Sequence, residues 1–253
     1  RSGSWVANSD HAIRQATGEY VSVLHQDDFW YPERLTTLRE CVRRAPDTVL
    51  WLHPVWYVDS HGRRLGRWTC PLPTRERPLS SDIVLEHLLV QNFVGMPAPL
   101  FRRDAFLATR GMDARLWYVA DWDLWLSLAE RGTTGYMPRA LAAFRIHADS
   151  QTVRRGQDLE DLREQHRIAF SRHFPEWTCR DERHRDHVRA AFEVSTDLNI
   201  WLMGRMQGRA APLRSLPRRL VGLGPSGWRR LWRDSRIGER VMARVKGRWR
   251  GGY

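Results

Sequence analysis

Lysine is almost absent from this sequence: of its 41 basic residues, only Lys246 is not an arginine. So uniform a bias is typical of genomic base composition rather than of a need for guanidinium chemistry. The formal net charge is +12, and it is unevenly placed, because from Trp201 onward fourteen basic residues accompany only Asp234 and Glu239. The rest of the chain is close to neutral. This pattern argues against a nucleic-acid-binding body and predicts that the tail contacts an anionic surface.

Cysteine and long apolar runs are also scarce. The three cysteines lie far apart without C-x-x-C spacing, which disfavours a disulfide framework or zinc site and fits a reducing cytosol. No apolar run approaches the roughly 18 residues that span a bilayer, and no signal peptide is recognisable. We expect a cytoplasmic protein. If it attaches to a membrane, we expect peripheral attachment to the inner face of the cytoplasmic membrane. Since the first residue is Arg1, we also expect the chain to begin within a longer protein.

A short apolar run at residues 20–24 breaks into His25-Gln26-Asp27-Asp28. Such a run is typical of a buried parallel strand, and the carboxyl ends of these strands form the ligand-binding edge of an open α/β sheet. A histidine and two carboxylates at that edge are hard ligands, suited to Mg²⁺ or Mn²⁺ carrying a phosphate. The same residues also fit an ordinary polar turn, with Asp28 near a helix start.

Apolar periodicity predicts alternating helices and strands along the body of the chain. The expected parallel α/β unit comprises a helix ending before Gly18, strands at 20–24, 48–52 and 55–58, and a helix from Pro32 to about residue 45. Residues 63–81 lack periodicity and are expected to form a surface loop. Further helices are expected from Ser81, over 102–111 and 121–129, with a short strand near residue 100 and an edge strand over 140–146.

A second acidic cluster, Asp121-Trp122-Asp123, stands at the start of a predicted helix. Residues two apart cannot share a helix face, so one aspartate can point into a cleft while the other caps the helix or faces solvent. An aspartate at this position is often only a cap. His147, after the strand expected at 140–146, is in the same way either structural or a ligand.

The tail beyond the body has helical spacing over 158–173 and 186–206, followed by alternating basic and bulky apolar residues such as Trp228-Arg229-Arg230-Leu231-Trp232. Basic helices with tryptophan and leucine on the opposite face lie in the membrane interface and favour anionic lipid. A disordered basic tail is the alternative.

Several motifs occur in a specific order. They are residues 10–21, Asp27-Asp28, Pro32-Glu33-x-Leu35, Gly111-Met112-Asp113, Asp121-Trp122-Asp123-Leu124-Trp125 and Phe144-Arg145-Ile146-His147. Together, from about residue 5 to 152, they resemble a family 2 glycosyltransferase of the GT-A fold. The resemblance implies a three-layer α/β/α sandwich lacking its first strands (1–155), a helical extension (156–208) and a basic amphipathic or disordered tail (209–253).

The resemblance implies inverting sugar transfer from a UDP-, dTDP- or GDP-sugar to a hydroxyl of a glycan or lipid-linked acceptor, in surface polysaccharide biosynthesis. A metal held by a D-x-D segment would neutralise the departing diphosphate. The matching positions here make His25 and Asp27 the expected metal ligands, with Asp28 beside them and His147 near the diphosphate. Because imidazole binds Mn²⁺ better than Mg²⁺, we expect Mn²⁺ to be preferred.

The general base of such enzymes is the second member of a Glu-Asp pair, which here corresponds to Asp121, preceded by Ala120. Asp123 is the fallback and is expected to be structural. Candidate acceptor contacts are Met96, Trp122 and Asp123, although core packing explains the apolar ones equally well.

Relatives carry their first strands and nucleotide-base loop ahead of the point where this sequence starts. We therefore expect a truncated copy with an exposed apolar sheet edge, and the activity of this chain alone is in question. One alternative is a non-catalytic glycosyltransferase-like interaction module at the membrane surface. The other is a nucleic-acid-binding protein, which the +12 charge permits and the neutral body disfavours.

Overall fold

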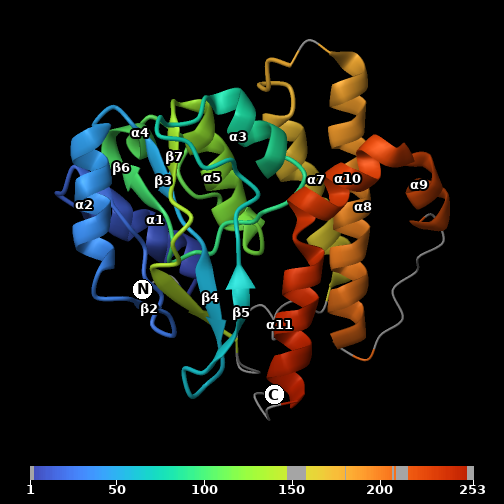
Figure 1. Cartoon of the computed structure of the whole chain (residues 1–253), viewed down its shortest axis with the longest axis horizontal. Coiled ribbons are helices and arrows are strands. Elements are labelled where there is room, and N and C mark those ends of the chain that lie inside the picture. The colour runs from blue at the N-terminus through green and yellow to red at the C-terminus, as the bar shows by residue number, and fades with distance from the viewer. Residues whose placement is uncertain (1–2, 147–157, 180, 207, 209–215, 250–253) are drawn as a thin grey trace.

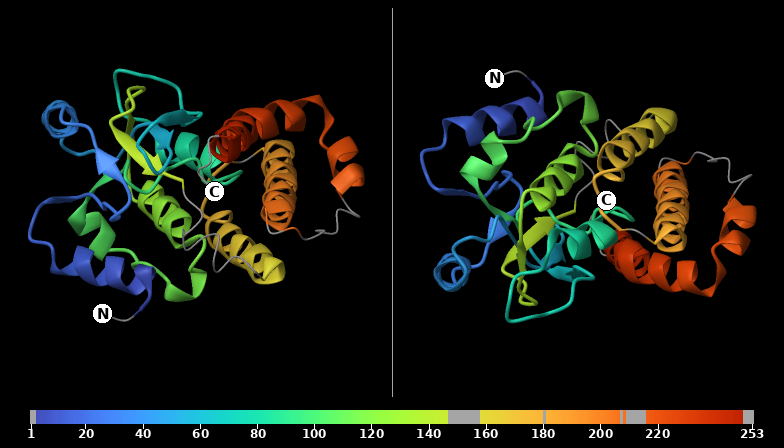
Figure 2. Two further views of the ribbon diagram at one scale, coloured as in Figure 1. Left: turned by 90° about the horizontal axis from the view of Figure 1, so that it is seen from below. Right: turned by 90° about the horizontal axis from the view of Figure 1, so that it is seen from above.

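The computed structural model describes residues 3–146, 158–179, 181–206, 208 and 216–249. In this part of the chain, two four-stranded mixed sheets lie among the first helices, and the C-terminal helices form a layer along one side (Figures 1 and 2). The α/β class predicted from the sequence is confirmed.

The first sheet has the order β1-β6-β3-β7. Its strands are β1 (Tyr20–Val21), β6 (Leu100–Arg102), β3 (Leu50–Leu52) and β7 (Thr134–Tyr136). Strand β6 lies between β1 and β3 and is antiparallel to both, whereas β3 and β7 are parallel. Strands β1 and β3 therefore run parallel to each other, as the sequence predicts, but β6 from much later in the chain lies between them.

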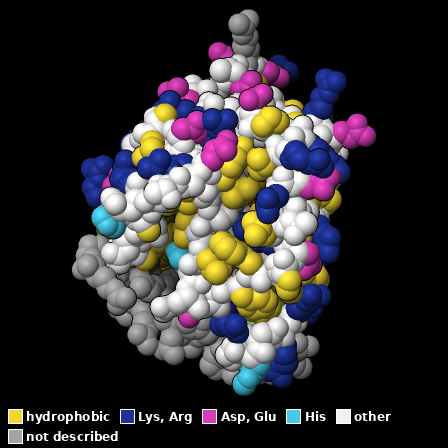
Figure 3. Space-filling model, turned by 90° about the vertical axis from the view of Figure 1, so that its left-hand side faces the viewer, with side chains coloured by type: hydrophobic (Ala, Val, Ile, Leu, Met, Phe, Trp, Pro, Cys, Tyr) yellow, Lys and Arg dark blue, Asp and Glu magenta, His cyan; other side chains and the backbone are white. Residues whose placement is uncertain are grey.

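Strand β1 forms one edge of this sheet, and large apolar side chains are exposed beside it. Leu24 is 43% exposed, Trp30 37% and Leu35, on the neighbouring helix α2 (Arg34–Arg44), 66%. Figure 3 views this side of the molecule and shows apolar side chains gathered at its centre. None of these three residues belongs to β1 itself, so the apolar exposed edge expected from the sequence stays a prediction.

The second sheet has the order β2-β8-β4-β5. Its strands are β2 (Phe29–Trp30), β8 (Ala142–Arg145), β4 (Val55–Val58) and β5 (Arg64–Trp68). Two sequence expectations are wrong here. Part of the expected loop at 63–81 is strand β5, antiparallel to β4. Strand β8 is internal instead of an edge strand, because its backbone pairs with β2 on one side and with β4 on the other.

Helix α5 (Ala120–Glu130) lies at the centre of the core. Residues 120 and 122–129 are all buried, and the ring of Trp125 packs against Phe101 of β6. The surrounding elements are α1 (Trp5–Gln15), α3 (Ser81–Leu88), α4 (Arg103–Leu107) and the 3₁₀ turn η1 (Ala114–Leu116). Burial around most of its circumference explains why tryptophan and leucine occur on several faces of this helix.

The helices predicted over 158–173 and 186–206 are confirmed as α7 (Leu159–His173) and α8 (Glu182–Met206). Asp158 caps α7, its carboxylate accepting hydrogen bonds from the N–H groups of Glu160 and Asp161, each 3.0 Å long. Helices α9 (Leu216–Gly222), α10 (Gly224–Ser235) and α11 (Ile237–Trp249) follow.

The last helices pack onto the body. Helix α10 lies against α8 and α11 against β5, and one hydrophobic core runs from Val6 to Leu231 of α10. None of the helices in the described ranges combines the length and apolarity that crossing a bilayer requires. The division at residues 155 and 208 stays a prediction.

Gly135 of β7 offers a test of how tightly the first sheet is packed. An added Cβ there would lie 2.2 Å from two ring carbons of buried Trp51 on β3. We expect Gly135→Ala to lower the free energy of unfolding by about 2 kcal/mol through overpacking, measured by urea denaturation. In the control Gly66→Ala, the new Cβ would lie 4.0 Å from Ala243, and we expect a change of about 0 to 1 kcal/mol in the stabilising direction. Equal losses in both variants would contradict this packing.

Candidate functional site

The acidic turn, residues 25–28, connects β1 to β2. A hydrogen bond from the Asp28 N–H to the His25 carbonyl closes it (3.1 Å). Arg145, the last residue of β8, holds it from outside: its N–H donates to the Asp28 carboxylate (2.9 Å) and its Nε to the Asp27 carbonyl (2.8 Å). The turn is therefore fixed at the end of β8, just ahead of His147, which itself lies outside the described residues.

Arg145 also joins the acidic turn to the loop between β4 and β5. Its Nη1 donates to the carbonyls of Asp59 (2.7 Å) and Ser60 (2.9 Å). No sequence signal assigned a role to Arg145, although this residue belongs to the Phe-Arg-Ile-His motif. Its position at the end of a strand, next to a candidate ligand, is the signal that could have found it.

Buried Arg34 supports the backbone that leads into the acidic turn. Its Nη2 donates to the Ser22 hydroxyl (2.8 Å) and the Ala98 carbonyl (3.0 Å), and its Nε lies 3.2 Å from His53 Nε2. Burial lowers the pKa of Arg34 to about 10, so the side chain stays charged at neutral pH. It occupies the open position of the Pro-Glu-x-Leu motif and has a structural role that the sequence did not disclose.

The His25 ring lies edge-on against the indole of Trp5, with centroids 5.5 Å apart. Its Nε2 is buried and has no hydrogen-bond partner among the described residues. Burial lowers the pKa of His25, although Asp27 opposes this effect. A neutral imidazole with an unpaired nitrogen is the form that binds a metal ion.

A metal fits this turn only in part. Within the ranges that the structure describes, no three His, Cys, Asp or Glu side chains are grouped so that they could hold a metal ion. The Asp28 carboxylate accepts a hydrogen bond from Arg145. His25 and Asp27 stay the predicted metal ligands. The preference for Mn²⁺ over Mg²⁺ stays a prediction.

Trp5 connects the acidic turn to the segment before α5. Its Nε1 donates to the Trp117 carbonyl (2.9 Å), while its ring contacts His25. Residue 117 is four positions ahead of Asp121, so Trp5 links the regions of the two acidic clusters. No sequence signal assigned this function to Trp5.

Asp121 lies in the first turn of α5, not at the predicted N-cap, which is Val119. Its carboxylate accepts hydrogen bonds from Asn92 Nδ2 (3.1 Å) and from the Trp122 N–H (2.8 Å). Burial raises the pKa of Asp121 to about 6 despite these two bonds. Such a carboxylate is ionised near neutral pH and is a stronger base than an ordinary aspartate, which suits general-base chemistry.

Asn92, in the loop after α3, was missed by the sequence analysis. Its Oδ1 accepts the N–H of Val94 (3.0 Å), which leaves its amide N–H groups to face Asp121. The adjacent Gln91 is buried and accepts a hydrogen bond from Ser195 of α8 (2.8 Å). The loop that presents Asn92 is thus anchored to the C-terminal layer.

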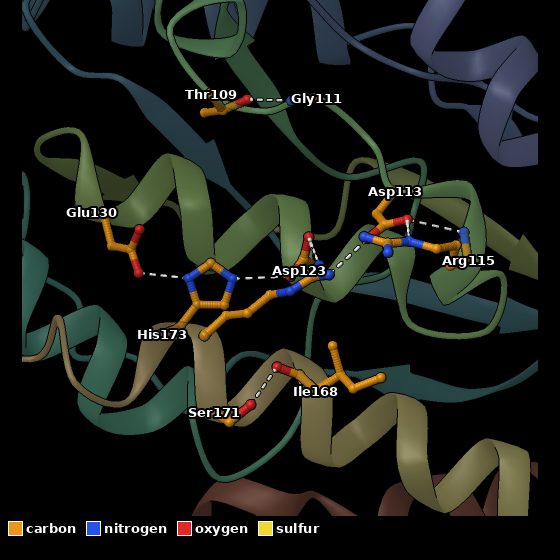
Figure 4. A network of polar contacts seen from close by, with 10 residues as sticks. Thr109, Gly111, Asp113, Arg115, Asp123, Glu130, Ile168, Ser171 and His173 are labelled. Atoms are coloured by element: carbon orange, nitrogen blue, oxygen red, sulfur yellow. Dashed lines mark hydrogen bonds and ion pairs between the residues drawn. The ribbon is translucent and has the colours of Figure 1, made fainter.

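Asp123 is fully buried and joins α5 to α7 (Figure 4). His173 Nε2 lies 3.1 Å from its carboxylate, and His173 Nδ1 lies 2.6 Å from Glu130. Arg172 donates to Asp123 (3.3 Å) and to Asp113 (2.7 Å). Burial lowers the pKa of His173, but its two carboxylate partners raise it more, so the pKa lies above its usual value. The contribution of His173 to stability is therefore fully present below its usual pKa and is lost as the pH rises through the raised value.

The three candidate acceptor contacts are buried. Trp122 is 1% exposed and donates from Nε1 to the Leu88 carbonyl (2.9 Å), Met96 is 4% exposed, and Asp123 is enclosed by the network above. Because α5 is packed on all sides, none of them presents a surface to a sugar in this structure. Contact of these residues with the acceptor stays a prediction.

Comparison with known proteins finds a family similar to the first part of the chain. A model described as "Glycosyl transferase family 2" matches residues 2–107, a segment that contains the acidic turn. Asp121 lies beyond the matched segment.

Curated relatives extend beyond this chain. An uncharacterised protein of Mycobacterium tuberculosis is 27% identical over 143 residues, covering 56% of this chain and 39% of the relative. The amylovoran biosynthesis glycosyltransferase AmsE of Erwinia amylovora is 26% identical over 146 residues, covering 57% of this chain and 51% of AmsE. The chain thus spans about half, or less, of the length of these relatives.

Solved structures share the fold. A crystal structure of S. aureus TarS 1–349 in complex with UDP aligns with a TM-score of 0.55 at 14% identity, covering 100% of this chain and 73% of the TarS chain. A second TarS structure gives 0.54, also at 14% identity, covering 97% of this chain and 43% of that one. The fold is GT-A-like, as the family 2 resemblance implies.

The two aspartates of α5 should differ in their effect on stability. We expect Asp123→Ala to lower the free energy of unfolding by about 3 kcal/mol, because it removes the buried carboxylate that Arg172 and His173 share and leaves each of them with one acidic partner. Asp121→Ala removes two hydrogen bonds, from Asn92 and from the Trp122 N–H, which water can replace. We expect it to lower the free energy of unfolding by about 1 kcal/mol or less. Urea denaturation at pH 6 and pH 9 tests both, and the loss for Asp123→Ala should be larger at pH 6. Similar losses for the two variants would refute this assignment.

The pKa of Asp121 can be measured directly by carboxyl-carbon NMR titration. We expect a value near 6 and a further rise in Asn92→Ala, because the lost hydrogen bond favours the charged carboxylate. Gln91→Ala is the control, since Gln91 anchors the same loop without contacting Asp121. An unchanged pKa in Asn92→Ala, or an equal rise in the control, would rule out direct action of Asn92.

Proposed function

We propose that the chain forms part of an inverting glycosyltransferase, of the hexosyltransferase type, that moves a sugar from a nucleotide diphosphate sugar to a hydroxyl of a glycan or lipid-linked acceptor. One observation carries the proposal: in a family 2 fold, Trp5 links the acidic turn to the segment before Asp121, a carboxylate whose pKa is raised. A donor-side ligand set and a base are the two parts that such a reaction needs.

On the donor side, His25 and Asp27 would hold a divalent ion, with Asp28 and His147 near the diphosphate. A bound cation would supply neutralising charge for the diphosphate as it leaves. The unpaired Nε2 of His25 supports Mn²⁺ over Mg²⁺. Arg145 would hold the turn in place through its bonds to Asp27 and Asp28.

On the acceptor side, Asp121 takes the proton from the attacking hydroxyl. The acceptor oxygen bonds to the anomeric carbon while the bond from that carbon to the diphosphate oxygen breaks, so the configuration inverts. Asn92 orients the carboxylate. With a pKa of about 6, Asp121 is mostly ionised at neutral pH, and transfer should slow as the pH falls below that value.

The partners follow from the same reasoning. We place the donor among UDP-, dTDP- or GDP-sugars, and the UDP bound to TarS makes a uridine nucleotide the first to try. The name of AmsE favours an acceptor in polysaccharide biosynthesis. A lipid-linked acceptor would place the protein at the inner face of the cytoplasmic membrane.

A non-catalytic, glycosyltransferase-like interaction module is the second candidate. Two observations favour it. His25 stands at the first position of the D-x-D segment. Among the described residues, no three His, Cys, Asp or Glu side chains are grouped so that they could hold a metal ion. In this case the acidic turn would be only a structural connection between β1 and β2.

Isothermal titration of Mn²⁺, with and without UDP or dTDP, separates the two candidates. We expect nucleotide binding to require Mn²⁺, to vanish in Asp27→Ala and to persist in the control Asp47→Ala, an exposed carboxylate after α2. Failure of the folded protein to bind nucleotide would favour the module.

Transfer itself should be measured in a form of the protein that binds the donor. We expect Asp121→Asn to lower kcat by roughly 10²–10⁴-fold without weakening nucleotide binding. Unchanged turnover would show that Asp121 is not the base.

A further inference from the structure

Two tryptophans and two arginines lie on the outward side of α10. Trp228 is 45% exposed and Trp232 71%, and the two are four residues apart, so they share a face. Arg229 and Arg233 follow them with the same spacing and are exposed as well. The outer face of α10 thus has an aromatic row beside a basic row.

The apolar row continues onto α11. A Cβ added at Gly238 would lie 3.9 Å from the ring of Trp232, so the start of α11 lies beside that indole. Met242 and Val245 are four and seven residues after Gly238, on the same helix face, and are 53% and 47% exposed. We name Trp228, Trp232, Met242 and Val245 the α10–α11 stripe.

The opposite side of both helices is bound to the body, which leaves the stripe as their free side. Leu231 of α10 belongs to the main core, and Asp234 lies 2.9 Å from His87 of α3. Ala243 of α11 is buried near Leu65 of β5, and Glu239 accepts the Thr69 N–H (2.9 Å). Figure 2 shows α9 to α11 wrapping around one side of α8.

The charge around the stripe is positive. Arg229, Arg233 and Lys246 are exposed beside it. Residues 216–249 contain only two acids: Asp234 is fully buried, and Glu239 is paired with Arg236 and Thr69. Arg233 also contacts Asp234 (2.6 Å), so its positive charge is partly offset. Two copies of such a face would repel each other, which disfavours self-association.

We propose that the α10–α11 stripe binds the surface of an anionic lipid bilayer. The tryptophan rings would enter the boundary between head groups and acyl chains, and the basic side chains would contact lipid phosphates. Indoles suit this boundary because one edge is apolar and the other donates a hydrogen bond. The inference goes beyond the proposed sugar transfer, because it requires neither nucleotide nor Asp121.

Co-sedimentation with vesicles tests the proposal. We expect binding to vesicles of phosphatidylcholine with about one third phosphatidylglycerol, weak binding to pure phosphatidylcholine, and a decline as salt screens the charges. The paired changes Trp228→Ala with Trp232→Ala, and Arg229→Gln with Arg233→Gln, should each lower the partition coefficient about tenfold or more.

Matched controls lie on α2 and α4. Leu35→Ala with Leu107→Ala removes exposed apolar side chains, and Arg39→Gln with Arg43→Gln removes exposed charges, without touching the stripe. Both should bind vesicles like the unmodified protein, and so should Asp121→Asn. Equal losses in the controls, or no binding of the unmodified protein to anionic vesicles, would overturn the proposal.

Circular dichroism and sedimentation velocity complete the test. The stripe variants should keep their helical content and their oligomeric state, because both tryptophans are exposed and because buried Asp234 keeps Arg230 and His87 as partners when Arg233 is changed. If the stripe variants dissociate a dimer while vesicle binding is unchanged, the stripe is a contact between copies and the lipid proposal is wrong.

Discussion

The rotation of α5 about its own axis is the constraint on which the candidate site depends. Arg172 and His173 of α7 contact Asp123 from one side. These contacts fix the rotation of α5 about its axis. Residues two apart on a helix are separated by about 200°, so fixing Asp123 inward toward α7 directs Asp121 to a different side, where Asn92 meets it. The structural aspartate thereby positions the candidate base.

A comparable anchor holds the acidic turn. Arg145 donates hydrogen bonds to one carboxylate and one carbonyl of the turn, and to two carbonyls of the β4–β5 loop. Both anchors use arginine, whose several donors in a planar group can serve two segments at once. The composition bias toward arginine is thus put to structural use, whatever its origin.

The sequence predicted the order of the elements better than their neighbours. Periodicity found α7 and α8 because it is a local signal, and motif order gave a resemblance that the family match over residues 2–107 supports. Strand pairing depends on partners far along the chain, so β6 between β1 and β3, and β8 inside its sheet, were not foreseen. The roles of Asn92, Arg145 and Trp5 were missed for the same reason: their decisive contacts lie 29, 118 and 112 residues away.

The charge of the tail shows why a count of residues is a poor guide to a surface. Arg230 is buried against Glu86 and Asp234, Arg236 is paired with Glu239, and Arg219 with Glu193. These arginines attach the C-terminal helices to the body and to each other, and their charges are largely matched. Exposed Arg229, Arg233 and Lys246 beside the stripe contribute positive charge to the outer face of α10 and α11. Because the inward arginines hold α10 and α11 in place, the outward ones can act together on a flat anionic surface without the cost of ordering a free tail.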